Sequence, residues 1–138
     1  MINNRLLEFL PRVVGMHQNG FVPSRFIIYN ILTVNEAIER TLKEGSTGVV
    51  TFYDFTKAFD SVSHSAIGRT LKHLKVPHQF YELIISLVNA PAQVLVNGQR
   101  SPEFRIESET RHGDPMSPTL LALAIEPLTR MILNDSTI

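Results

Sequence analysis

Apolar residues recur at spacings of three and four in several stretches, and this pattern constrains the fold more than any other feature of the sequence. The clearest stripe consists of Ile27, Ile31, Val34, Ile38 and Leu42. Such spacing places the side chains on one face of a helix, and Gly45 follows where a helix commonly ends. Similar stripes predict helices over residues 3–14, 67–74, 80–87 and 121–132, with Pro11 breaking or kinking the first.

Two regions follow a different pattern. Residues 48–54, Gly-Val-Val-Thr-Phe-Tyr-Asp, are too few and too β-branched for a helix, so they predict a short buried strand. The dipeptide Asn97-Gly98 suits a tight hairpin turn between strand-like runs, and Phe104 and Ile106 alternate with charged residues. The order of elements predicts an α+β fold in which the hairpin packs beside strand 48–54, with helices on one face.

The composition bounds the function. The chain has 138 residues, about one domain, and its 13 basic and 13 acidic residues give no net charge. This balance argues against a strongly basic surface for nucleic acid. The sequence has no run of 18 apolar residues, so no membrane partner is expected. It also has no cysteine and begins with an amphipathic segment rather than a signal peptide, so an intracellular location is expected, with the nucleus left open.

Asp54 raises the functional question, because a carboxylate ends the apolar run 49–53. One interpretation is a helix N-cap, in which the side chain accepts hydrogen bonds from backbone N–H groups. The other is a ligand for a hard divalent cation, which prefers oxygen donors. The spacing alone leaves both interpretations open.

Three segments together narrow the choice. The sequence FYDFTKAFDSVSH (52–64), with RHGDPMSPTLLALAIEPL (111–128) and HQNGFVPSR (17–25), resembles the reverse transcriptases of non-LTR, LINE-type retrotransposons. The motifs occur in the family's order, and the resemblance runs from about residue 4 to residue 130. It implies the fingers and part of the palm of a right-hand polymerase. On this basis residues 1–138 are a partial reverse transcriptase domain, with fingers-like helices over about 1–47 and an incomplete palm over about 48–138.

The resemblance also implies a catalytic role for Asp54. Its carboxylate is expected to bind Mg²⁺ or Mn²⁺, with the carbonyl of Phe55 as a further oxygen ligand. In the family, two metals about 3.5–4 Å apart stabilise the attacking and leaving oxygens. The expected partners are an RNA template, a DNA primer and deoxynucleoside triphosphates.

Several residues match substrate-binding positions of the family. The backbone around Lys57 and Ala58 is expected to donate N–H groups to the triphosphate. The ring of Phe59 resembles the steric gate that leaves no room for a ribose 2′-hydroxyl. Phe59 also suits a core aromatic of the turn, and the two roles are compatible.

Further contacts come from the other two motifs. Arg25 is expected to contact phosphate or nucleotide, although a solvated loop arginine is equally consistent with the sequence. Gly113 is expected to let the backbone approach the nucleotide, where a Cβ would intrude. His112 stands where the family has a glutamine that contacts the nucleotide sugar, Met116 where it has leucine, and Ser24 where many relatives have glycine.

The resemblance implies that a second acidic cluster, an aromatic-x-Asp-Asp turn, follows downstream, and the sequence contains no Asp-Asp pair. The thumb that grips primer and template in the family is likewise expected to lie outside these 138 residues. The chain is therefore expected to be inactive alone and to require a C-terminal palm and thumb segment. A complementing fragment, and a domesticated transposon remnant that binds RNA or protein, are the alternatives. Weak, salt-dependent binding of a primer–template is expected from local basic patches such as Arg69, Lys72 and Lys75.

Overall fold

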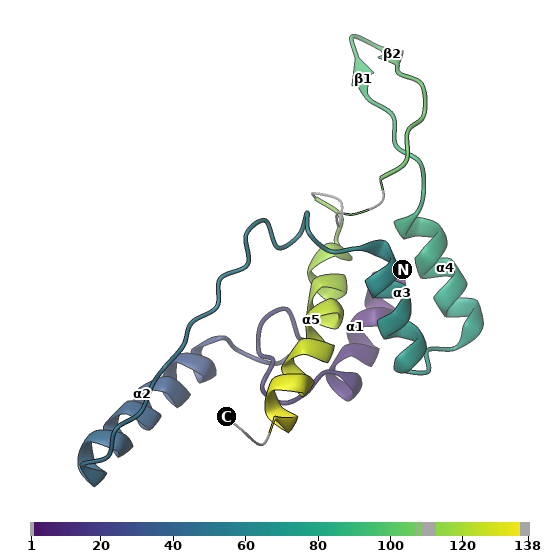
Figure 1. The fold of residues 1–138 in the computed structure, drawn as a ribbon. Coiled ribbons are helices and arrows are strands. Elements are labelled where there is room, and N and C mark those ends of the chain that lie inside the picture. The colour runs from purple at the N-terminus through teal and green to yellow at the C-terminus, as the bar shows by residue number, and fades with distance from the viewer. Residues whose placement is uncertain (1, 107, 109–112, 136–138) are drawn as a thin grey trace.

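The structure, a computed structural model, describes residues 2–106, 108 and 113–135. In chain order the elements are α1 (Ile2–Val13), α2 (Ile28–Glu44), α3 (His64–His73), α4 (His78–Val88), β1 (Leu95–Val96), β2 (Gln99–Arg100) and α5 (Ser117–Asn134). Figure 1 shows α1, α3, α4 and α5 gathered at the centre, with α2 and the hairpin extending from them. The helices and the small antiparallel sheet confirm the predicted α+β class.

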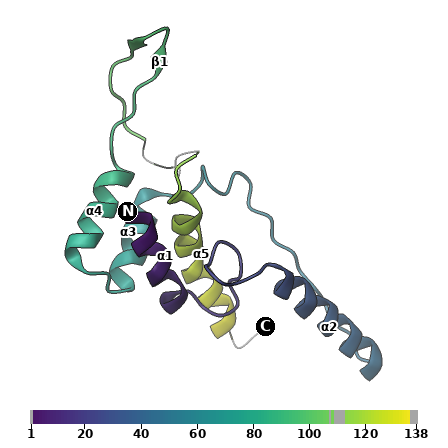
Figure 2. The ribbon, with the colours of Figure 1, turned by 180° about the vertical axis from the view of Figure 1, so that it is seen from behind.

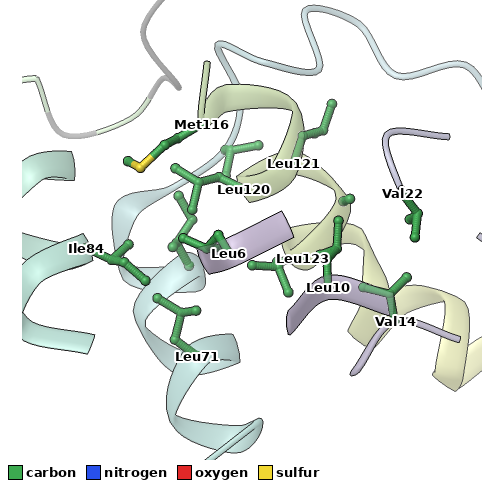
Figure 3. Close-up of a cluster of buried hydrophobic side chains, with 13 residues drawn as sticks. Leu6, Leu10, Val14, Val22, Leu71, Ile84, Met116, Leu120, Leu121 and Leu123 are labelled. Carbon is green, nitrogen blue, oxygen red and sulfur yellow. The ribbon is translucent and has the colours of Figure 1, made fainter. Parts of the chain in front are cut away.

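The core lies where α5 packs against both α1 and α3, while α4 packs against α3. Leu6 and Leu10 of α1, Leu71 of α3 and Leu123 of α5 are almost completely buried there. Figure 3 shows these side chains directed toward one another from the three helices. Each such burial contributes about 1.5–3 kcal/mol. The helical stripes predicted from the sequence therefore supply the core, except for that of α2.

Helix α2 forms as predicted but stands apart from the core. It ends at Gly45, which has a left-handed φ of 64°, and the N–H of Ser46 donates to the carbonyl of Thr41 at 3.1 Å. No residue of α2 is buried, and its apolar stripe is exposed except at Val34, which is half-buried. Both Figure 1 and Figure 2 show the helix projecting from the bundle.

The strand predicted over residues 48–54 is wrong. These residues form an extended segment with no strand assignment, and Val49, Phe52 and Tyr53 are 92%, 80% and 78% exposed. A strand needs a neighbouring strand to take its backbone hydrogen bonds. The only paired strands among the described residues belong to the hairpin, which pairs with itself.

The hairpin forms at the predicted turn but not in the predicted place. Leu95 pairs with Arg100 and Val96 with Gln99, and both turn residues, Asn97 and Gly98, have positive φ, as a type I′ turn requires. The prediction that it packs beside residues 48–54 with helices on one face is wrong. Both strands are exposed, and the hairpin extends away from the helices (Figure 1).

The strand expected around Phe104 and Ile106 is reduced to one bridge. Phe104 pairs with Ala92, their backbones exchanging hydrogen bonds of 2.9 and 3.0 Å. Ile106 lies outside any strand. Within the part of the chain that the structure describes, no helix is both long and apolar enough to cross a membrane.

Candidate active site

Arg25 fixes the loop between α1 and α2. Its guanidinium nitrogens donate hydrogen bonds to four backbone carbonyls, those of Gly15, Gln18 (2.9 Å), Pro11 (3.2 Å) and Val14 (3.2 Å). Carbonyls at a helix C-terminus lack partners within the helix, and Arg25 supplies them at the end of α1. Its side chain is therefore more than a solvated loop arginine. Contact with a nucleotide stays a prediction for this residue.

The segment after Asp54 folds into a tight turn. Lys57 has a φ of 50°, and its carbonyl accepts hydrogen bonds from the N–H groups of Asp60 and Ser61, both at 2.9 Å. No acceptor among the described residues takes the N–H groups of Lys57 and Ala58. These two donors are thus available to an external anion, as the predicted triphosphate contact requires.

Phe59 joins two of the three motif segments. Its ring meets that of Phe21 edge to face, with centroids 6.1 Å apart and planes at 71°. Phe21 belongs to the 17–25 segment, and its backbone has a positive φ of 60°. Phe59 is half-buried and packs against the core. The core-aromatic interpretation is confirmed, and the steric-gate role stays a prediction.

Asp54 lies exposed on the extended segment before the turn. The N-cap interpretation is wrong, because the next helix, α3, begins ten residues later at His64. The carboxylate of Asp54 and the carbonyl of Phe55 are hard oxygen donors, which suit Mg²⁺ in kind. Among the described residues, no group of three or more His, Cys, Asp or Glu side chains is arranged to hold a metal ion.

The 111–128 motif contains the start of α5. His112 lies outside the described residues. Gly113 has a φ of 82°, and nothing lies within 4 Å of the position of a Cβ there, so its backbone conformation rather than crowding favours glycine. The Asp114 carboxylate accepts a hydrogen bond from the N–H of Met116 at 2.9 Å and so supports the start of the helix. Met116, in place of the family leucine, is buried.

An open pocket of about 480 Å³ separates the turn from α5. It is lined on one side by residues 55–66 and on the other by α5. The lining residues are Phe55, Thr56, Ala58, Ser61, Val62, Ser63, Ala66, Leu121, Ala124, Ile125 and Leu128. The pocket therefore places the 52–64 motif opposite α5, most of which belongs to the 111–128 motif.

A buried carboxylate on α5 was missed by the sequence analysis. Glu126 is 2% exposed, accepts a hydrogen bond from the N–H of Gly15 at 3.0 Å and pairs with Arg130 at 2.6 Å. Arg130 in turn donates to the carbonyl of Val13 at 2.8 Å. Together they anchor the start of the 15–25 loop to α5. The available signal was an acid and a base four residues apart in an otherwise apolar helix.

The whole chain matches one known protein family. A family profile described as "Reverse transcriptase (RNA-dependent DNA polymerase)" matches residues 1–138. The chain belongs to the reverse transcriptase family. The three motif segments that Arg25, Phe59 and Glu126 hold in place are thus parts of one reverse transcriptase domain.

Two of the relatives come from retrotransposable elements and a third from a transposon, which confirms the resemblance to non-LTR retrotransposons. The chain is 31% identical over 107 residues to the Pol polyprotein of the type-1 element R2 of Popillia japonica, covering 77% of this chain and 18% of that protein. It is 29% identical to the Pol polyprotein of the type-2 element R2DM of Drosophila melanogaster over 86% of this chain and 11% of the relative. It is 28% identical to the 149 kDa protein of transposon TX1 of Xenopus laevis, over 91% of this chain and 10% of that protein.

Proposed function

We propose that this reverse transcriptase segment forms the nucleotide-facing part of an RNA-directed DNA polymerase. The observation that carries the proposal is the Phe21–Phe59 contact, which brings two motif segments together in a chain that matches the family throughout. The substrates would be deoxynucleoside triphosphates, with an RNA template and a DNA primer.

Asp54 and Phe55 would hold the divalent ion, Mg²⁺ or Mn²⁺, that enzymes of this family generally use. The exposed position of Asp54 leaves its carboxylate accessible, and an ion bound there would stabilise negative charge on the transferring phosphoryl group. The N–H groups of Lys57 and Ala58 would bind triphosphate oxygens. Their orientation is fixed by the hydrogen bonds that the Lys57 carbonyl accepts from the turn.

Phe59 would exclude ribonucleotides. A ring held by both the core and Phe21 cannot yield easily to a 2′-hydroxyl, so discrimination would depend on that packing. Gly113, Arg25 and His112 are the further nucleotide contacts in this proposal. For Arg25 such a contact would compete with the carbonyls that it already serves.

Asp54 is a single carboxylate, and the proposal therefore includes a second segment with an Asp-Asp turn and a thumb. Without them the chain would not hold primer, template and nucleotide in line, and proximity accounts for about 7–11 kcal/mol of a barrier. The isolated chain should extend an RNA-templated primer at no measurable rate.

The test joins this chain to the corresponding downstream segment of the R2 Pol polyprotein of Popillia japonica and measures primer extension. Asp54→Asn should lower the rate by at least about 100-fold, as removing an electrostatic interaction with the transition state does. Phe59→Val should increase ribonucleotide incorporation with little effect on deoxynucleotides, and His112→Gln should leave activity equal or higher. Glu36→Gln, an exposed acid of α2, is the matched control and should change nothing.

Full activity in the Asp54→Asn fusion would overturn the catalytic assignment, and robust synthesis by the isolated chain would overturn the need for a second segment. A non-catalytic RNA-binding module is the second candidate. It is favoured by Arg69 and Lys72, exposed cations that make no ion pair with the described residues. That function would leave RNA binding intact in a fusion that never extends a primer.

A further inference from the structure

Helices α3 and α4 and residues 105–106 enclose an open groove of about 800 Å³. Three cations line it, Arg69 and Lys72 from α3 and Arg105 from the segment after the hairpin. None of the described lining residues is acidic. In a chain with no net charge, this is a local concentration of positive charge. The groove also contains none of the candidate catalytic or nucleotide-binding residues.

The chain reaches this arrangement through two contacts. Arg69 and Lys72 are three residues apart on α3 and therefore lie on the same face of the helix. Ser63, just before α3, forms an isolated bridge with Ser108, and Arg105 lines the same groove as the residues of α3. A residue far away in sequence thus adds its charge to the two on α3.

The cationic groups are held without being neutralised. Arg69 donates a hydrogen bond of 3.3 Å to the hydroxyl of Ser65, and the Lys72 ammonium lies 5.2 Å from the centre of the Tyr81 ring. Neither contact removes positive charge, and none of the three cations pairs with an acid of the described chain. Like charges gathered in this way repel one another, so an anion bound between them would be stabilised.

Apolar groups such as Ile85 and Ile106 form part of the remaining lining, and its polar groups are held by hydrogen bonds. His64 is buried, and its Nδ1 lies 3.1 Å from the amide oxygen of Asn89, which links α3 to the end of α4. The hydroxyl groups of Ser63 and Ser65 are 2.7 Å apart at the edge of the groove. Such hydroxyl and guanidinium groups suit phosphate oxygens, and the planar fork of arginine binds them in pairs.

We propose that this groove binds the phosphate backbone of single-stranded nucleic acid, at a site separate from Asp54. Cations beside an aromatic ring are typical of surfaces that follow a single strand. The site needs neither a metal ion nor a nucleotide, so it can exist whether or not the chain contributes to polymerisation.

The experiment measures fluorescence anisotropy of labelled oligouridylate RNA, the matching DNA strand and a duplex with the purified chain in EDTA, over a range of salt concentrations. The triple variant Arg69→Gln, Lys72→Gln, Arg105→Gln should weaken single-strand binding by more than about tenfold at low salt. The slope of log affinity against log salt should fall by about 0.7 for each phosphate that the variant no longer neutralises.

Lys75→Gln is the matched control. This lysine follows α3 and is exposed, but it lies outside the groove, so binding should be unchanged. Arg105 lies outside every helix, so replacing it alone should not disturb the fold of α3. The single variant Arg105→Gln should therefore weaken binding even if substitutions on α3 disturb folding. Asp54→Asn should bind as the unaltered chain does, which separates this site from the proposed catalytic one.

Three outcomes would overturn the proposal. The first is unchanged RNA affinity in a triple variant whose circular dichroism spectrum is that of the unaltered chain. The second is a loss of affinity in Lys75→Gln as large as that in the triple variant. The third is binding of the duplex that is as tight as binding of the single strand, or tighter. Polyglutamate that displaces RNA through these same residues at equal concentration would instead assign the groove to an acidic protein partner.

Discussion

Arg25 is a residue whose surroundings the sequence did not indicate. The motif suggested a contact with phosphate, while the structure directs its guanidinium to four carbonyls near the end of α1. The charge of a guanidinium strengthens each of these hydrogen bonds. A residue can match a motif for reasons of folding, and a substitution can separate that role from substrate binding.

Arg25→Gln should lower the free energy of unfolding by about 1.5–3 kcal/mol, the usual value of hydrogen bonds to a charged group. Arg25→Lys should not restore stability, because one ammonium lacks the planar fork that reaches several carbonyls. Urea unfolding followed by circular dichroism measures both. Arg40→Gln removes an exposed ion pair with Glu44 and should change stability by less than about 0.5 kcal/mol. If Arg25→Gln leaves the free energy of unfolding unchanged, the hydrogen bonds of Arg25 do not stabilise the fold, and ligand binding is the role that remains.

Helix α2 shows at the scale of an element that periodicity predicts a helix without predicting its burial. Its apolar stripe sets the element and Gly45 ends it, yet Ile31 and Leu42 are 52% and 75% exposed. The chain on either side carries the helix away from the core, as Figure 2 shows.

The exposure of α2 leads to a stability prediction. Leu42→Gln should change the free energy of unfolding by less than about 0.5 kcal/mol, as surface substitutions do. Leu71→Ala on α3, where the leucine is fully buried, should cost about 2–5 kcal/mol because it removes apolar packing and leaves a cavity. Urea unfolding of the two variants in parallel is the measurement. An equal cost at both positions would show that α2 is packed in solution.

Across the described residues, exposed apolar side chains lie on α2, on the segment 49–55, on the hairpin and on the last turns of α5. Phe52 and Tyr53 are among the most exposed of them, on a backbone segment without strand partners. An extended segment with unpaired backbone groups and exposed apolar side chains favours association with another chain.

The purified chain should therefore self-associate as its concentration rises. Substituting Phe52→Ser and Tyr53→Ser together should shift the distribution toward monomer, because these rings supply apolar surface on the unpaired segment. Sedimentation velocity over a concentration series measures the change. Met16→Ser, which removes a single exposed side chain from the 15–25 loop, should have a smaller effect. A monomer at every concentration would contradict the prediction.

The sequence by itself determined the helices, the turn at Asn97-Gly98 and the family. A helix satisfies its backbone hydrogen bonds within one segment, and a type I′ turn depends on two adjacent residues, so local patterns are sufficient for both. The motifs are equally local, since the residues around Asp54 and Gly113 occur at fixed spacings. Each of these features can be read without knowing what lies beside it.

Only the tertiary structure decided which of these segments meet. Residues 48–54 have the composition of a strand but no strand beside them, and backbone pairing requires one. The contact of Phe59 with Phe21, the burial of Glu126 against Gly15 and the approach of Arg105 to α3 all join residues distant in sequence. Such contacts depend on how the helices pack, which no single stretch of sequence encodes, and they fix the geometry of both proposed sites.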